Sequence, residues 1–159
     1  MHLNSSKEFP YTMDVAWQAL HQPAKLDVEP GSMVTVLSDT QWQASNTETG
    51  AVTLYTASFD DDAKKLTIEG ASNKKHDHDF IYLTLSEVAE DKVALDIEIR
   101  IETGMHVIAK ALGAILSKPM QEIMCKHIYH NFDALCLGSE TKTLSNDDLK
   151  DIAKKTFEK

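Results

Sequence analysis

The stretch MHVIAKALGAILSKPMQEIMCKHIYHNFDALCL, residues 105–137, decides the fold that this sequence predicts. Its apolar side chains recur at the spacing of an α-helix. They are Ile108, Leu112, Ile115, Leu116, Met120, Ile123, Met124, Ile128, Phe132 and Leu135. Such a helix would be about 50 Å long at about 1.5 Å per residue. Pro119 is expected to bend it, because proline lacks a backbone N–H and clashes with the preceding turn. The prediction is one long amphipathic helix with two successive apolar faces.

The preceding residues 32–103 carry the pattern of an antiparallel β-sheet. Short β-type runs alternate with turn residues, and the linkers are short enough for hairpins. The runs cover residues 33–37, 41–44, 51–59, 65–72, 80–88 and 93–101. In the last run, charged residues alternate with the apolar Val93, Leu95, Ile97, Ile99 and Ile101. One face of the sheet is therefore expected to be apolar, and the long helix is the element large enough to cover it.

Shorter elements are expected before this predicted antiparallel meander of residues 32–103. Residues 2–9 show alternation and end at a proline, which suits an edge or first strand. Thr12 is positioned as the N-cap of a short helix over residues 13–21. Pro23 either ends this helix or begins a second short one through Leu26.

The composition argues against several classes of protein. The chain has 159 residues, 42% of them hydrophobic and 26% charged, as in a single folded domain. Its formal charge of −9 disfavours nucleic acid as a partner, because nucleic-acid binding needs a cationic surface. No apolar run reaches about 18 residues, so no membrane-spanning helix is expected. The first residues lack the apolar region of a secretory signal, and we expect a cytoplasmic protein.

The two cysteines are expected to be reduced. Cys125 and Cys136 are eleven residues apart in the predicted long helix. A straight helix would separate them by about 16 Å, which is beyond the reach of a disulfide. Reduced thiols also fit a cytoplasmic protein, and no zinc-type cysteine spacing is present.

The order of strand, two short helices, antiparallel meander and long C-terminal helix resembles the START-like, or SRPBCC, superfamily. Local features that support the resemblance are Phe9-Pro10, the helical segment 15–20, Pro30-Gly31 before the meander, and Gly113 and Pro119 in the long helix. The resemblance covers residues 1–138. It implies an α+β helix-grip fold, in which a curved antiparallel sheet wraps around one long C-terminal helix and two short helices follow the first strand.

The tail, residues 139–159, extends beyond the segment that carries the resemblance. Residues 145–148 resemble a capped helix start, and a narrow apolar stripe follows them. We expect a short amphipathic helix here, docked on the domain or on a partner.

In the superfamily, the gap between sheet and helix is commonly an apolar cavity that holds lipids, sterols, polyketides or other hydrophobic small molecules. The resemblance therefore implies a hydrophobic ligand, whose desolvation would supply most of the affinity. The candidate cavity residues are Trp42, Tyr55, Phe59, Tyr82, Ile97, Ile99, Met105, Leu112, Leu116, Met120, Met124 and His127. Each could equally be an ordinary core residue. Tyr55, Tyr82 and His127 are the polar candidates for orienting the ligand.

Two histidine pairs are candidates for metal or acid–base chemistry. His127 and His130 are three residues apart on the predicted helix and could face the same way. A third ligand is missing, so boundary histidines, one hydrogen-bonded and one solvated, are the favoured interpretation. His76 and His78 lie in a predicted polar hairpin, which explains them without a metal. We predict no metal site and, because GxGxxG and Walker sequences are absent, no cofactor.

Two alternatives to a ligand-binding protein remain open. The first is a polyketide cyclase or dehydratase of the same superfamily, with His127 or Tyr82 as the acid or base in the cavity. No motif for nucleophilic catalysis is present, so the sequence assigns no other catalytic residue. The second is a non-catalytic interaction module with a filled core, whose outer surface or tail helix contacts a partner. The volume of the pocket would separate these alternatives, but that volume is set by side-chain packing in the folded protein. The sequence pattern also assigns neither the ligand nor the oligomeric state.

Overall fold

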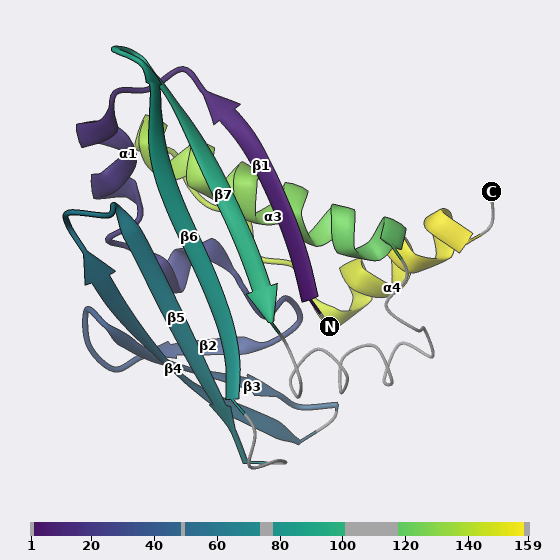
Figure 1. Cartoon of the computed structure of the whole chain (residues 1–159). Coiled ribbons are helices and arrows are strands. Elements are labelled where there is room, and N and C mark those ends of the chain that lie inside the picture. Colours follow the sequence, from purple (N-terminus) through teal and green to yellow (C-terminus); the bar gives the residue numbers. More distant parts are fainter. Residues whose placement is uncertain (1, 49, 74–77, 101–117, 158–159) are drawn as a thin grey trace.

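The computed structural model describes residues 2–48, 50–73, 78–100 and 118–157, and within these ranges the fold is α+β (Figure 1). Seven antiparallel strands form one sheet in the spatial order β1-β7-β6-β5-β4-β3-β2. The strands are β1 (His2–Phe9), β2 (Met33–Val36), β3 (Gln41–Asn46), β4 (Ala51–Asp60), β5 (Lys65–Ser72), β6 (His78–Ala89) and β7 (Lys92–Arg100). The predicted meander is confirmed from β2 to β7, and β1 joins it beside β7 as an edge strand.

Alternation of side chains gives the sheet an inner and an outer face. The inner side chains of β7 are all buried: Val93, Leu95, Ile97 and Ile99. Asp96 and Arg100, which alternate with them, are exposed. β1 pairs with β7 from His2 opposite Arg100 to Phe9 opposite Val93. Directly opposite residues share a face, so this register turns Phe9 into the interior.

Two short helical segments follow β1. α1 (Met13–Ala19) begins at the predicted N-cap, where the Thr12 hydroxyl accepts a hydrogen bond from Val15 N at 3.3 Å. It ends two residues earlier than predicted, because the backbone tightens there and His21 N donates to Gln18 O, three residues back. η1 (Pro23–Leu26) is a single 3₁₀ turn with proline at its start.

The long C-terminal helix is confirmed in part. α3 runs over Lys118–Leu137, and the predicted portion over residues 105–117 lies outside the described residues. The predicted bend at Pro119 is therefore not tested. Of the helices in the described ranges, none is long and apolar enough to cross a membrane.

The hydrophobic core lies between the inner face of the curved sheet and the helices α1 and α3 (Figure 1). Ile128 and Phe132 of α3 are almost fully buried against it. Phe9 and Phe132 meet edge to face, with ring centroids 4.9 Å apart. Aromatic pairs in this arrangement stabilise a fold by about 1 kcal/mol beyond their area burial. The contact joins the end of β1 to α3.

The C-terminal segment packs on the domain through its helix α4 (Asn146–Phe157) and the residues before it. Leu144 and Leu149 are buried in the core cluster. The predicted capping box is confirmed, since Ser145 Oγ accepts from Asp148 N and Asp148 Oδ2 accepts from Ser145 N. Gly31 has a φ of 88° and donates its N–H to Leu144 O at 2.8 Å. A Cβ added there would lie 2.4 Å from Asn146 Oδ1, so this close approach requires glycine.

Candidate functional site

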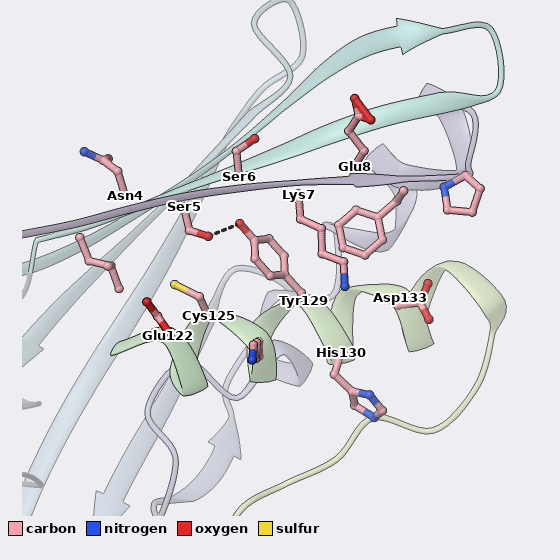
Figure 2. A pocket seen from close by; sticks show the side chains of 14 residues that line it. Asn4, Ser5, Ser6, Lys7, Glu8, Glu122, Cys125, Tyr129, His130 and Asp133 are labelled. Carbon is pink, nitrogen blue, oxygen red and sulfur yellow. Dashed lines mark hydrogen bonds between the residues drawn. The ribbon is translucent and has the colours of Figure 1, made fainter. Parts of the chain in front are cut away.

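A groove of about 1010 Å³ runs between β1, which begins the strand order of the described residues, and one side of α3 (Figure 2). Its first wall is the stretch of residues 3–10. Its second wall is formed by Glu122, Cys125, Lys126, Tyr129, His130 and Asp133. These positions recur at the three- and four-residue spacing of one helical face. One edge of the sheet and one face of α3 therefore build the groove.

Tyr129 bridges the two walls of the groove. Its hydroxyl donates to Ser5 Oγ at 2.8 Å (Figure 2). Burial raises the pKa of Tyr129 to about 12, so the hydroxyl is a neutral donor at neutral pH. Cys125 is buried close by, and burial raises the pKa of its thiol as well. The floor of the groove is thus uncharged and largely apolar.

Lys7 places a positive charge above this floor. Its side chain reaches from β1 toward α3 in Figure 2. The ammonium nitrogen lies 5.4 Å from the centroid of the Phe9 ring and 5.9 Å from that of Tyr129. Cation–π attraction holds the ammonium group over the two rings. An ammonium group carries three N–H donors, so it can also bind the polar end of a ligand.

The acidic groups at one end of the groove have other partners. The Glu8 carboxylate lies 3.8 Å from the ammonium of Lys92. Asp133 accepts a hydrogen bond from the Tyr11 hydroxyl. Burial, together with that hydrogen bond, raises the pKa of Tyr11 to about 12. These two carboxylates therefore have partners of their own, while Lys7 stands over the aromatic floor and the exposed Glu122 and Lys126 add one charge of each sign along α3.

A second polar cluster is buried at the inner face of the sheet, around Glu29. Its Oε2 accepts a hydrogen bond from Ser32 at 2.6 Å. Its Oε1 accepts from Thr53 at 3.1 Å and from the Tyr55 hydroxyl at 3.0 Å. Burial raises the pKa of Glu29, the negative charge of the buried Asp79 adds to this, and the three hydrogen bonds oppose it. Burial also raises the pKa of Tyr55 well above its ordinary value. The cluster therefore holds a carboxyl group that keeps its proton to higher pH than an exposed glutamate.

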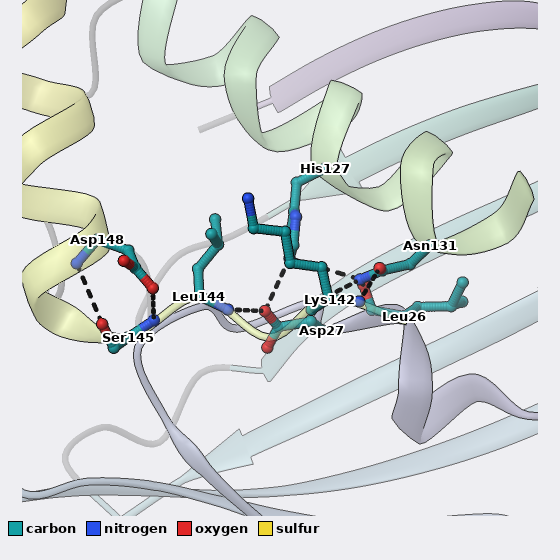
Figure 3. Close-up of polar contacts among 8 residues, drawn as sticks. All are labelled: Leu26, Asp27, His127, Asn131, Lys142, Leu144, Ser145 and Asp148. Atoms are coloured by element: carbon teal, nitrogen blue, oxygen red, sulfur yellow. Dashed lines mark hydrogen bonds and ion pairs between the residues drawn. The ribbon is translucent and has the colours of Figure 1, made fainter. Parts of the chain in front are cut away.

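A third cluster joins α3 to the C-terminal segment (Figure 3). Asp27, in a left-handed conformation after η1, accepts hydrogen bonds at Oδ2 from His127 at 2.8 Å and from Leu144 N at 3.0 Å. Asn131 donates to Leu26 O at 3.1 Å and to Lys142 O at 3.0 Å. It also accepts from Lys142 N at 2.7 Å. These hydrogen bonds tie α3 to the residues before α4, while the buried Asp27 Oδ1 has no hydrogen-bond partner among the described residues.

Most of the sequence-predicted cavity residues that are described face the interior. Trp42, Tyr55, Ile97, Ile99 and Met124 are all buried members of the core cluster. Trp42 and Tyr55 stack with ring centroids 5.4 Å apart. Phe59 is half-buried and stacks on His21 of the segment after α1. None of these residues lines the groove between β1 and α3. Met105, Leu112 and Leu116 lie outside the described residues, as does the side chain of Met120.

Tyr82 requires a correction. The inner positions of β6 are taken by Ile81 and Leu83, so alternation turns Tyr82 to the outer face of the sheet. There the ammonium of Lys65 lies 4.6 Å from its ring centroid, and the ring of Phe80 stacks beside it. Tyr82 can neither line a cavity between sheet and helix nor act as an acid or base inside it. A shift of one residue in strand phase accounts for the error.

The histidines do not gather at one site. His127 is buried against Asp27, whereas His130 is exposed at the rim of the groove. One is hydrogen-bonded and the other is solvated, as the favoured interpretation predicts. His78 bonds to Glu69 on the outer face, and His76 lies outside the described residues.

The sequence interpretation missed the residues that build the groove and the acid cluster. Lys7 had a detectable signal, because it occupies the same strand phase as Leu3 and Phe9, which makes it a charge on the inner face of an edge strand. Glu29 had none. It lies in a loop before Pro30-Gly31, where no periodicity distinguishes a buried carboxyl from an exposed one.

Comparison with known proteins shows the fold. No family model matches the sequence, and no curated protein matches it either. Solved structures do match. A START superfamily protein from Mycobacterium smegmatis has a TM-score of 0.50 and 7% identity, covering 86% of this chain and 94% of its own. The chain therefore has the START-like helix-grip fold.

Two enzymes with the same fold are also similar in structure. An aromatase/cyclase from a Streptomyces species matches with a TM-score of 0.52 and 11% identity, over 87% of this chain and 92% of its own. Truncated norcoclaurine synthase from Thalictrum flavum matches with a TM-score of 0.54 and 13% identity, over 86% of this chain and 93% of its own. At these identities the likeness concerns the fold alone.

Proposed function

We propose that the protein binds an apolar small molecule that carries an anionic or polar group, in the groove between β1 and α3. The observation that carries this proposal is Lys7, whose ammonium stands over the rings of Phe9 and Tyr129 inside a groove of about 1010 Å³. Ligand pockets have volumes of about 300–1,000 Å³ and combine apolar walls with a few placed polar groups.

Each part of the ligand has a counterpart in the groove. Its apolar body would lie against the partly exposed Leu3 and the edges of the largely buried Phe9 and Tyr129 rings, and release of water from the groove would contribute to the affinity. Its anionic group would meet Lys7 and set the orientation. The hydroxyl of Ser5, already bonded to Tyr129, is a neutral polar group on the same wall.

Anilinonaphthalene sulfonate tests the proposal, because it joins an aromatic body to one negative charge. The wild-type protein should bind it with a rise in fluorescence. Lys7→Gln should weaken binding about fivefold, since a partly exposed charge pair contributes about 1 kcal/mol.

Lys65→Gln is the matched control, because Lys65 also lies over an aromatic ring but on the outer face of the sheet. Its affinity for the probe should equal that of the wild type. Equal affinities of Lys7→Gln and wild type, or no probe binding at all, would contradict the proposal.

A second candidate function is acid catalysis on a substrate that reaches the Glu29 cluster at the inner face of the sheet, a site distinct from the β1–α3 groove, which Glu29 does not line. The observation that favours it is Glu29, a buried carboxyl whose pKa is raised and which three hydroxyl groups hold in place. A protonated carboxyl can donate to a carbonyl oxygen of a bound substrate. The acid in this candidate is Glu29 and not Tyr82, which lies on the outer face of the sheet.

The two candidates differ in the fate of the ligand. A linear poly-β-ketone thioester, incubated with the protein, should be cyclised by an enzyme and recovered unchanged from a binding protein. If cyclisation occurs, Glu29→Gln should abolish it while the protein still binds anilinonaphthalene sulfonate. Cyclisation that persists in Glu29→Gln would exclude Glu29 as the acid.

A further inference from the structure

The second edge of the sheet, β2, exposes apolar side chains to solvent. β2 pairs with β3 on one side, and it ends the strand order of the described residues. Met33 is 66% exposed, Val36 63%, and Leu37, directly after the strand, 55%. Such an edge is a template for pairing with another strand.

The backbone groups that face the open edge can be assigned. Leu37 N donates to Gln41 O on the β3 side. In an antiparallel ladder, alternate residues turn their N–H and C=O groups to the same neighbour. Thr35 therefore faces β3 as Leu37 does, and the N–H and C=O groups of Val34 and Val36 point to the open edge.

The charge pattern of this edge favours a second copy of the chain over a charged partner. No charged residue occurs in residues 30–38, although the chain carries a formal charge of −9. The net negative charge opposes association of two copies through charged surface, whereas this uncharged edge adds no such repulsion. The opposite edge, β1, carries Lys7 and Glu8, which are the charges that natural edge strands use against pairing.

The sequence of the edge is also self-complementary. Met33-Val34-Thr35-Val36-Leu37 has the same apolar pattern in both directions about Thr35. Antiparallel pairing of two copies about a two-fold axis at Thr35 places Val34 of each copy opposite Val36 of the other. These are the residues whose backbone groups point outward, so each pair can exchange two hydrogen bonds. Met33 then lies opposite Leu37 of the second copy, and apolar side chains meet on both faces.

We propose that β2 pairs with β2 of a second copy, so that two sheets join into one continuous sheet across a two-fold axis. The contact is isologous and closes at the dimer. It involves a single short strand from each copy, so the dimer should form in a concentration-dependent way. It lies at the opposite edge of the sheet from the β1–α3 groove, and is independent of ligand binding.

Sedimentation velocity of the full chain tests the proposal. Over a concentration series from micromolar to millimolar, the wild-type mass should rise from 17.7 kDa towards twice that value. Val36→Glu should keep the protein monomeric throughout, because it places a carboxylate in the pairing edge of an acidic protein. Val88→Glu is the matched control, since Val88 is 50% exposed at the far end of β6, and it should dimerise as the wild type does.

A second variant keeps the test independent of added charge. Val36→Pro removes one outward N–H donor without removing a donor to β3, and it should also abolish the dimer. Circular dichroism of both Val36 variants should match that of the wild type. A wild type that stays monomeric, dimers that persist in both Val36 variants, or growth beyond the dimer would each overturn the proposal.

Discussion

Removal of the Asn131 side chain should destabilise the protein strongly and release the C-terminal segment. Asn131 is fully buried and makes three hydrogen bonds to backbone groups, one to Leu26 and two to Lys142. In Asn131→Ala, the buried carbonyl of Leu26 loses its partner, which costs about 1–3 kcal/mol. The two groups of Lys142 are partly buried and can regain water, so their loss costs about 0.5–1.5 kcal/mol each. Together these losses amount to about 2–6 kcal/mol.

Urea unfolding followed by the fluorescence of the buried Trp17 and Trp42 measures the free energy of unfolding. Hydrogen exchange of residues 142–149 reports on the docking of the C-terminal segment. Asn131→Asp is a second variant, in which the side chain keeps its volume. It keeps the acceptor for Lys142 N but replaces the NH₂ donor by an oxygen that faces two carbonyl groups. Asn131→Asp should destabilise the protein about as much as Asn131→Ala does.

Asn4→Ala is the control, since Asn4 is exposed on β1. Its free energy of unfolding should stay within about 0.5 kcal/mol of the wild type. If Asn131→Ala loses less than about 1 kcal/mol and its C-terminal amides exchange at the wild-type rate, the hydrogen bonds of Asn131 do not hold the segment.

Three further predictions concern the Glu29 cluster and the β1–α3 groove. The pKa of Glu29 in the folded protein is raised above 4.5, so its contribution to stability is complete below that pH and is lost as the pH rises through the folded-state pKa. The free energy of unfolding of Glu29→Gln, relative to that of the wild type, should therefore rise from pH 4 to pH 7. A difference that does not depend on pH would contradict this prediction. Tyr129→Phe and Ser5→Ala should each lower the free energy of unfolding by about 1 kcal/mol, and a double-mutant cycle should give a coupling energy of about 0.5–1.5 kcal/mol. Additive losses would mean that the hydrogen bond between the two side chains does not stabilise the fold. Cys125 should react with a thiol reagent at pH 7 far more slowly than the unfolded chain does, because it is buried and its pKa is raised; equal rates would show that the groove floor is open to solvent.

The sequence predicted the elements whose pattern is local. The alternation in β7 placed Val93 and Ile99 on the inner face, and Thr12 correctly marked the start of α1. These signals depend on neighbouring residues alone, so they survive in the sequence. Tyr82 shows the limit of such reasoning, because β6 is recognisable as a strand from its composition while its phase depends on pairing with β5 and β7.

The candidate site depends on contacts between distant residues, and the sequence could not reveal it. The groove exists because β1 pairs with β7, about 90 residues later, and leaves its other edge beside α3. Glu29 is buried because residues from the loop and from β4 converge on its carboxyl group. Neither arrangement has a periodic signature, and side-chain chemistry alone does not distinguish a buried glutamate from a solvated one.

The measurement that tests the proposed ligand site most directly is a titration of the isotope-labelled protein with anilinonaphthalene sulfonate, followed by amide chemical shifts. We predict that the largest shifts fall on β1 around Ser5 and Lys7 and on α3 around Cys125 and Tyr129, the two walls of the groove. Shifts confined to the outer face around Tyr82, or no shifts at saturating probe, would contradict the claim that the groove binds an apolar ligand.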